Sequence, residues 1–586
     1  MSRQDQALPG WLADYDAFST HLDEQLIDET SHGKGLRFVS FALAVLPWNP
    51  ATNGFDGFEL NSRLSHDKGV DILTAANEIG QQLLVQSKFR MRRTEEIDAV
   101  ISQFESYEAE FTAKQKPRQY TLFDVPGSID ATLPKYLIVT ASKLDNLMRL
   151  YKDSHRSSRP FFDRLTDEGR ITFVDGTEIL RTLKSTYRKA FEVPAEFEIQ
   201  AASEWLEYRT VRLGIVAGAE LVRLYDTHGD GLFFENIRTF LGLGRNQERE
   251  SVNRRIVKTV EEQPERMLER NNGITIRASR VRKTKAGALR LENASIVNGC
   301  QTTMCLVTRR EVVGTEVLVP VKVVESDDLW EVARSANYQN RVRQIDLDLA
   351  KYLRPQLVQR AAARMGVSVQ PDAAHGVNDL IATISSTQVT YEETKALYKG
   401  VFSTRPTNIF DNNYSSLLTA VLDVVYEHEE MSQEIFSALF VLSGVGQRGR
   451  EEGARVYPES ENRYFQRFRK PEYSAYITLL AAGVVNSMNL ADRQSDPINE
   501  AGRILDFLRQ ARDCAEHRPT DFVEAYLMAY EVLSETGLGS ITDESGDALI
   551  SQDLHKKILS TPYDTYYKAL RMRLQREKAR RDRGGS

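Results

Sequence analysis

The chain has 586 residues, of which 41% are hydrophobic and 27% are charged, and its formal net charge at pH 7 is −7. This length exceeds what one hydrophobic core organises, and the composition is that of an ordinary globular protein with several domains. The longest apolar run, residues 38–48, is too short to cross a bilayer, and no basic segment with a cleavage site precedes it. We therefore expect a cytoplasmic protein without a membrane partner.

Cysteine usage argues against two further kinds of site. The three cysteines, at positions 300, 305 and 514, form no Cys-x-x-Cys pair, and no histidine cluster accompanies them. Neither a zinc site nor a disulfide framework is expected. Cys300 is expected to be a small buried hydrophobe rather than a nucleophile.

Strands and helices alternate over the first 190 residues. Apolar residues recur at helical spacing from Trp11 onward, and residues 36–46 are apolar almost all round, which predicts a buried helix. Short β-rich runs predict strands at 69–74, 82–89, 136–140 and 171–178, and helices are predicted at 94–111 and 142–152. This alternation is typical of an α/β domain.

Two neighbouring strands of this domain carry side chains that could do chemistry. Asp71 lies in the first strand, and Gln86 and Lys88 lie two residues apart in the second. Because strand side chains alternate between faces, Gln86 and Lys88 point the same way and Asp71 can meet both. Carboxylate and carbonyl oxygens suit Mg²⁺ or Mn²⁺, and a lysine can orient water or offset negative charge.

This arrangement predicts metal-assisted hydrolysis of phosphodiester bonds. Asp71, Gln86 and Lys88 are the predicted catalytic residues, and Asp71, Gln86 and the nearby Asp67 are the predicted metal ligands. Such a short pattern on a half-exposed hairpin also occurs by chance, so a purely structural role is the alternative.

The same residues resemble a known nuclease superfamily. Asp71 followed by Gln86-Ser87-Lys88 is similar to the Mrr-like branch of the PD-(D/E)XK nucleases, in which Gln replaces the second acid. The resemblance implies a restriction-endonuclease-like domain at 1–190, with a mixed central sheet flanked by helices. That superfamily usually supplies another acid from the first helices, but residues 35–39 contain none. Glu24 or Glu29 could substitute, although both are expected to be solvated helix residues.

Two asparagine–glycine turns stand out in the middle of the chain. Asn271-Asn272-Gly273 begins one predicted strand, and Asn298-Gly299 ends another before a helix that starts with Cys300-Gln301-Thr302. Glycine lets backbone amides approach a ligand closely, and a helix start presents unpaired N–H groups, so this turn suits an anion or a nucleotide.

The predicted ligand or nucleic-acid contacts share amide, hydroxyl or guanidinium groups, which bind base edges, ribose or phosphate. They are Asn272, Asn298, Gln301, Thr302, Arg238 and Asn340. The structural alternative stays open, because Asn-Gly is the commonest short hairpin signal and amides often cap helices.

Five strings in one order resemble the AIPR family, whose proteins are associated with abortive-infection phage resistance in bacteria. They lie at 232–238, 252–255, 271–276, 296–303 and 336–347. The resemblance covers roughly residues 200 to 400. We expect an α+β AIPR core at 191–345, and apolar periodicity predicts a mostly helical region at 346–586.

AIPR-like proteins often carry a nuclease module at the N-terminus, so the two resemblances together imply an anti-phage effector. It would cleave nucleic acid, DNA rather than RNA, and its AIPR region would bind nucleic acid, a nucleotide or a phage-derived trigger. One alternative is a non-catalytic sensor built on a degenerate nuclease scaffold. Another is a structural subunit whose helical region forms a homo-oligomer.

Overall fold

The chain forms two compact units, which are described separately below. Unit 1 comprises Met1–Ala190 and His375–Ser386, and unit 2 comprises Phe191–Ala374 and Thr387–Ser586. Residues 375–386, predicted with the helical C-terminal region, thus group with the N-terminal unit. The computed structural model describes residues 8–26, 30–61, 70–114, 133–236, 252–328, 355–370, 377–385, 387–410, 416–426, 429–457, 470–538 and 560–584, with single residues 332, 335, 353, 556 and 558. No helix within these ranges combines the length and apolar character needed to cross a membrane.

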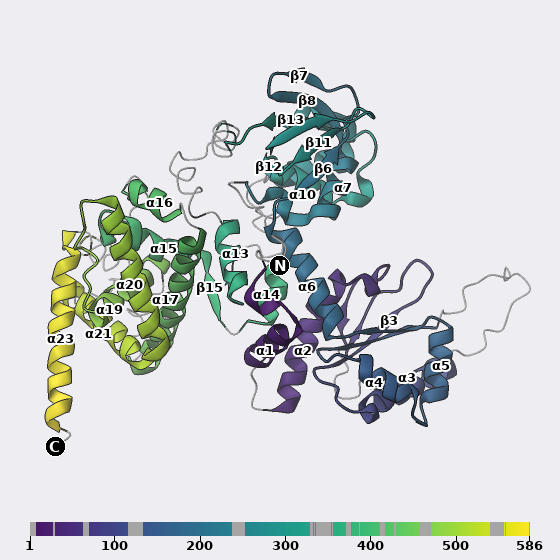
Figure 1. Ribbon diagram of the computed structural model, residues 1–586, viewed down its shortest axis with the longest axis horizontal. Coiled ribbons are helices and arrows are strands. Elements are labelled where there is room, and N and C mark those ends of the chain that lie inside the picture. The colour runs from purple at the N-terminus through teal and green to yellow at the C-terminus, as the bar shows by residue number, and fades with distance from the viewer. Residues whose placement is uncertain are drawn as a thin grey trace, which may run out of the picture. The chain divides into compact units, whose positions relative to one another are not determined.

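Unit 1 is built on a mixed five-stranded sheet with helices on both faces (Figure 1). The strand order is β1-β2-β3-β4-β5; the first two pairings are antiparallel and the last two are parallel. The expected mixed α/β architecture is therefore confirmed. Its elements are α1 (Tyr15–Gln25), α2 (Ser31–Val45), β1 (Glu59–Leu60), β2 (Ile72–Leu73), β3 (Leu83–Lys88), α3 (Thr94–Lys114), β4 (Lys135–Thr140), α4 (Asp145–Lys152), α5 (Arg159–Asp167), β5 (Ile171–Val174), α6 (Gly176–Phe191) and α14 (Val377–Thr383).

The middle of strand β4, residues 136–139, is apolar because both faces of the strand are covered. Tyr136 and Ile138 belong to a core cluster with side chains of α3, α4 and α5. Leu137 and Val139 point to the opposite face, and all four residues are fully buried. On that opposite face α2 packs against β3.

A buried carboxylate joins α3 to the sheet. Glu108 on α3 is 5% exposed and forms ion pairs with Arg170 and, at 2.6 Å, with Arg164. The Tyr136 hydroxyl donates a hydrogen bond to Glu108 at 3.2 Å, and burial raises the pKa of Tyr136. Removing one partner of such a network leaves a buried charge uncompensated, so this network fixes how α3 sits on β4.

Strand β5 is shorter than predicted, because the chain turns into a helix at Asp175. The sequence suggested a strand to residue 178, but β5 ends at Val174 and α6 begins at Gly176. The Asp175 carboxylate accepts hydrogen bonds from the backbone N–H groups of Thr177 and Glu178, at 2.9 and 3.0 Å. This N-terminal cap satisfies donors that the helix leaves unpaired, and it sets the boundary.

Unit 2 begins with an α+β part that contains two sheets. The larger sheet has the order β12-β9-β13-β8-β7, in which only β9 and β13 are parallel, and the smaller has the order β10-β11-β6. The sequence of residues 210–222 favours a strand throughout, but the segment forms β8 followed by α7. The elements are β6 (Glu196–Ile199), β7 (Leu206–Tyr208), β8 (Val211–Ala217), α7 (Gly218–His228), η4 (Gly229–Phe233), α8 (Val252–Glu262), α9 (Met267–Arg270), β9 (Ile274–Ala278), β10 (Arg280–Lys283), β11 (Leu289–Glu292), β12 (Ser295–Asn298), α10 (Cys300–Val307) and β13 (Leu318–Glu325).

The rest of unit 2 is mostly helical, as the periodicity predicted (Figure 1). Two buried glutamates form ion pairs here. Glu393 pairs with Arg450 of another helix at 2.6 Å, and Glu500 pairs with Arg503 of its own helix at 2.7 Å and with Arg493 of the preceding segment at 2.8 Å. The elements are α13 (Pro355–Arg364), β14 (Ser368–Gln370), β15 (Gln388–Thr390), α15 (Tyr391–Phe402), η7 (Pro406–Phe410), α16 (Thr419–Tyr426), α17 (Glu429–Val456), α19 (Pro471–Val485), α20 (Pro497–His517), α21 (Pro519–Leu538) and α23 (Tyr563–Gly584).

A buried histidine of α1 contacts the inserted segment 375–386 of unit 1. His21 is 7% exposed, stacks on Trp11 with ring centroids 4.6 Å apart, and shares a hydrogen bond with the backbone of Ile384. Burial lowers the pKa of His21 from 6.5 to about 4, because the charged imidazolium would lose its hydration. His21 is therefore held neutral.

This burial makes the stability of unit 1 depend on pH. The folded pKa of His21 is below its ordinary value, so the unfolded chain takes up the proton first as the pH falls. The contribution of His21 is complete above about pH 6.5 and is lost by about pH 4, and it amounts to about 3 kcal/mol. The free energy of unfolding, measured in urea at several pH values, should fall more steeply between pH 6.5 and 4 for the wild type than for His21→Phe, which keeps an aromatic ring on Trp11. The same pH dependence of the unfolding free energy in both proteins would contradict the lowered pKa of His21.

Candidate active site

The β2–β3 hairpin brings together the side chains predicted to act on phosphodiesters. Ile72 pairs with Val85, which places Asp71 opposite Gln86. The backbone N–H of Asp71 donates to Val85 O at 2.9 Å, and the Asp71 carbonyl accepts from Asn61 N at 2.9 Å. The backbone of Asp71 is therefore fixed from both sides.

The Asp71 carboxylate is held by two hydrogen bonds from β3. Gln86 Nε2 donates to Asp71 Oδ2 at 2.9 Å, and the backbone N–H of Ser87 donates to the same oxygen at 2.7 Å. Gln86 is 3% exposed, and its Oε1 is buried with no hydrogen-bond partner. A buried amide oxygen usually has a hydrogen-bond partner. If the Gln86 amide turned by half a turn, Oε1 would take the place of Nε2 beside Asp71.

Lys88 lies on the same face of β3 as Gln86, two residues nearer the end of the strand. It is half-buried and aligns with Thr140 of the parallel strand β4. Because β3, β4 and β5 are parallel, Lys88, Thr140 and Asp175 come from the same end of the sheet, where sites of such sheets lie. Thr140 and Asp175 were not among the predicted site residues. The sequence did carry a signal for Asp175, because an Asp followed three residues later by Glu before an apolar run indicates the start of a helix.

The described residues do not supply the additional acid from the candidates that the nuclease resemblance suggested. Glu24 on α1 is exposed, as expected of a solvated helix residue, while Asp67 and Glu29 lie outside the described ranges. Within those ranges, no group of three or more His, Cys, Asp or Glu side chains could hold a metal ion. The described part of the site therefore consists of one carboxylate, one amide and one amine.

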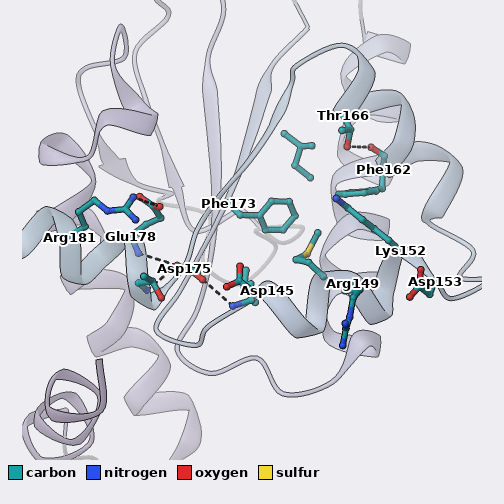
Figure 2. A pocket seen from close by; sticks show the side chains of 14 residues that line it. Asp145, Arg149, Lys152, Asp153, Phe162, Thr166, Phe173, Asp175, Glu178 and Arg181 are labelled. Atoms are coloured by element: carbon teal, nitrogen blue, oxygen red, sulfur yellow. Dashed lines mark hydrogen bonds and ion pairs between the residues drawn. The ribbon is translucent and has the colours of Figure 1, made fainter. Parts of the chain in front are cut away.

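A hollow of about 780 Å³ lies at the other edge of this sheet. Figure 2 shows Phe173 of β5 in its middle, the Arg181–Glu178 ion pair on one side, and Arg149 and Lys152 on the other. Its lining contains neither Asp71 nor Gln86, and β4 separates β5 from β3. The hollow is thus not the site that the sequence predicted.

The two asparagine–glycine turns of unit 2 are places of close backbone contact. Gly273 and Gly299 have φ angles of 84° and 104°, which favour glycine. A Cβ atom on Gly273 would lie 2.7 Å from Pro320 O, and one on Gly299 would lie 2.6 Å from Ile274 Cγ1. Both glycines are therefore required by the packing of β9, β12 and β13.

Several polar residues of the turns bond to each other. Asn271 Nδ2 donates to Thr302 Oγ1 at 3.0 Å, and Asn271 Oδ1 accepts from Gly273 N at 2.8 Å. Thr302 is 6% exposed, so its contact is internal. Asn272 is exposed, whereas Asn298 and Gln301 are half-buried on either side of Gly299.

Helix α10 starts at this turn without a side-chain cap on Gly299. It packs against α8, whose Arg254 and Arg255 are exposed. The predicted contacts Arg238 and Asn340 lie outside the described residues. Helix N-terminal N–H groups, amides and guanidinium groups are chemical groups that bind phosphate or nucleotides.

Other residues of the AIPR-like strings hold the sheet together. Asn236 is 2% exposed and donates to Ile296 O at 3.1 Å. Glu235 forms a buried ion pair with Arg277 at 3.3 Å, and Arg277 also donates to Ser326 O at 2.8 Å. Arg277 begins a sequence run rich in basic residues, 277–285, but its guanidinium group links β9 to the residues that follow η4 and β13 inside the domain.

The buried cysteines are unreactive in this setting. Cys300 is 5% exposed and Cys305 is fully buried, as expected for Cys300. Burial raises the pKa of Cys300 well above its ordinary value and that of Cys305 to about 12. The thiolate is the nucleophilic form, so neither thiol is a nucleophile at neutral pH.

Comparison with known proteins gives one match. Residues 233–514, a little less than half of the chain, match the family described as AIPR protein. This match supports the AIPR identity expected from the five strings, and it is consistent with a role in abortive infection against phage. Neither the curated proteins nor the solved structures give a match.

The close contact at Gly299 can be tested by substitution. Gly299→Ala combines a left-handed backbone, which costs about 1 to 2 kcal/mol, with an overpacked contact to Ile274, which costs about 1 to 3 kcal/mol more. Gly287→Ala is the matched control, since Gly287 has a φ of 85° but nothing within 4 Å of the added Cβ. Urea unfolding should show the larger loss of stability for Gly299→Ala, and equal losses would refute the packing argument.

Proposed function

We propose that this protein is an anti-phage effector whose unit 1 is a metal-dependent endonuclease. Its substrate would be nucleic acid, DNA rather than RNA, and the AIPR-matching region would bind nucleic acid or a nucleotide signal. The observation that carries the proposal is the pairing of Asp71 with Gln86 on adjacent strands, with Lys88 on the same face. The AIPR match supports the defence role.

The donor set fits a hard divalent cation. Asp71 and the Oε1 atom of Gln86 would hold Mg²⁺ or Mn²⁺, since both cations prefer oxygen ligands and Mg²⁺ keeps several waters. The buried Oε1 atom without a hydrogen-bond partner supports this fit. When bound, the cation would polarise a phosphoryl oxygen and lower the pKa of its water.

The other groups of the site have separate tasks. Lys88 would orient the attacking water or offset the negative charge that develops on phosphate. The backbone N–H of Ser87 keeps the Asp71 carboxylate in place, while the Gln86 amide would turn to present Oε1 to the cation and give up its Nε2 hydrogen bond to Asp71. A glutamate at position 86 would instead place a second negative charge against Asp71.

A second candidate is a binding or sensing protein on a nuclease scaffold that does not cleave. The hydrogen bonds to Asp71 favour it, because Oδ2 already accepts two donors and the pair is stable without a cation. Purified protein that binds nucleic acid or a nucleotide, but does not cleave it with Mg²⁺ or Mn²⁺, would select this candidate.

Cleavage assays on DNA and RNA test the leading proposal. Asp71→Asn can keep the hydrogen bond from Ser87 N but loses the charge, and Lys88→Ala removes the ammonium group. We expect each to lower metal-dependent cleavage by roughly a hundredfold or more. Lys135→Ala is the control, since Lys135 is also half-buried but begins β4, at the opposite end of the sheet. Full cleavage by both site variants would exclude these residues.

Gln86→Glu tests the role of the amide. Two carboxylates in contact disfavour each other's charged form, so we expect one pKa to rise and the metal-free protein to lose stability. A divalent cation would relieve this repulsion, and thermal unfolding should then show a larger stabilisation by Mn²⁺ in Gln86→Glu than in the wild type. Equal stabilisation of both proteins would argue against a cation at this site.

A further inference from the structure

A short segment from within the AIPR-matching region is part of unit 1. Residues 375–386 interrupt unit 2, and their helix α14 packs against α2. Leu380, Ile381 and Ile384 are 1%, 3% and 0% exposed. The match to the family spans 233–514, so a piece of that region lies in the N-terminal unit with three apolar side chains buried.

A polar contact accompanies this packing. His21 of α1 shares its hydrogen bond with the backbone of Ile384, and Trp11 stacks on the imidazole. The segment is therefore held by α1 as well as by α2. Apolar burial supplies the attachment, and the hydrogen bond fixes its register.

The strands on either side of the segment are paired with each other. β14 precedes it and β15 follows it, and they run parallel with Ser368 opposite Gln388 and Gln370 opposite Thr390. The chain therefore leaves unit 2 and returns to it at one small sheet, and α15 starts directly after β15.

Helix α2 connects the segment to the candidate active site. It also packs against β3, which carries Gln86 and Lys88. Phe38 of α2 lies against Phe89, the residue after Lys88, with ring centroids 5.4 Å apart. Phe38 and Phe41 are fully buried, so α2 cannot shift without disturbing the end of β3.

We propose that segment 375–386 is a conformational coupling element between the AIPR-matching region and β3. Its docking on α1 and α2 holds the end of β3 in place, and its release loosens that end. The consequence for cleavage rests on the proposed function, whereas the consequence for the order of β3 does not.

Hydrogen exchange on the full chain tests the coupling. Ile381→Ala removes buried apolar contacts between α14 and α2, and we expect amide exchange in 31–45 and 83–89 to rise roughly tenfold or more. Ile381→Val, which removes a single methylene, should raise exchange in the same peptides by a smaller factor, and it remains informative if the alanine variant unfolds. Ile409→Ala is the matched control, because Ile409 is also 3% exposed but belongs to η7 of unit 2.

The outcomes separate the coupling from the nuclease proposal. Faster exchange in β3 for the Ile381 variants, but not for Ile409→Ala, supports the coupling even if no form of the protein cleaves nucleic acid. If α2 and β3 exchange at the wild-type rate in both Ile381→Val and Ile381→Ala, the coupling is overturned, whatever the cleavage result. A response of β3 to Ile409→Ala as large as that to Ile381→Ala would also overturn it.

Discussion

The pairing of β3 on both of its edges is the constraint on which the candidate active site depends. An antiparallel partner, β2, brings Asp71 opposite Gln86, while a parallel partner, β4, aligns Lys88 with the carboxyl ends of the other parallel strands. A mixed sheet is needed for both effects, since neither pairing alone would place a carboxylate beside Gln86 and also direct Lys88 to that end of the sheet. Helix α2 packs against β3, but it is buried on one face only and not all round as its sequence predicted, since Leu36 is 45% exposed.

Buried glutamate–arginine pairs recur as connections between elements in both units. Glu108 joins α3 to the sheet of unit 1, Glu235 joins η4 to β9, and Glu393 joins α15 to α17. Removing charges from water is costly, so such pairs are poor sources of net stability and act mainly by fixing one arrangement. Asp71 differs from them, because its Oδ2 is held by an amide and a backbone N–H rather than by a guanidinium group.

Many residues of the AIPR-like strings make contacts that hold the fold together. Gly273, Gly299 and Asn236 are required by close strand contacts or by a buried carbonyl, and Asn271 bonds to Thr302 within the turn. Of the predicted contacts, Asn272 is exposed, and Asn298 and Gln301 are half-buried where α10 begins. A motif that identifies a family is therefore not by itself a list of binding residues.

The sequence alone determined the alternation of strands and helices in unit 1, the helical part of unit 2, and the juxtaposition of Asp71 with Gln86. These follow from local periodicity and from the alternation of side chains along a strand, which need only neighbouring residues. It misplaced the end of β5, where Asp175 caps a helix, and the end of β8, where α7 begins. Local signals do not decide such boundaries when a strand-like run continues into a helix.

Only the tertiary structure decided three matters: the placement of segment 375–386 in unit 1, the internal role of Arg277, and the separation of the hollow at β5 from Asp71. Each depends on contacts between residues far apart in the chain. Periodicity carries no information about which distant apolar face or carboxylate a residue will meet.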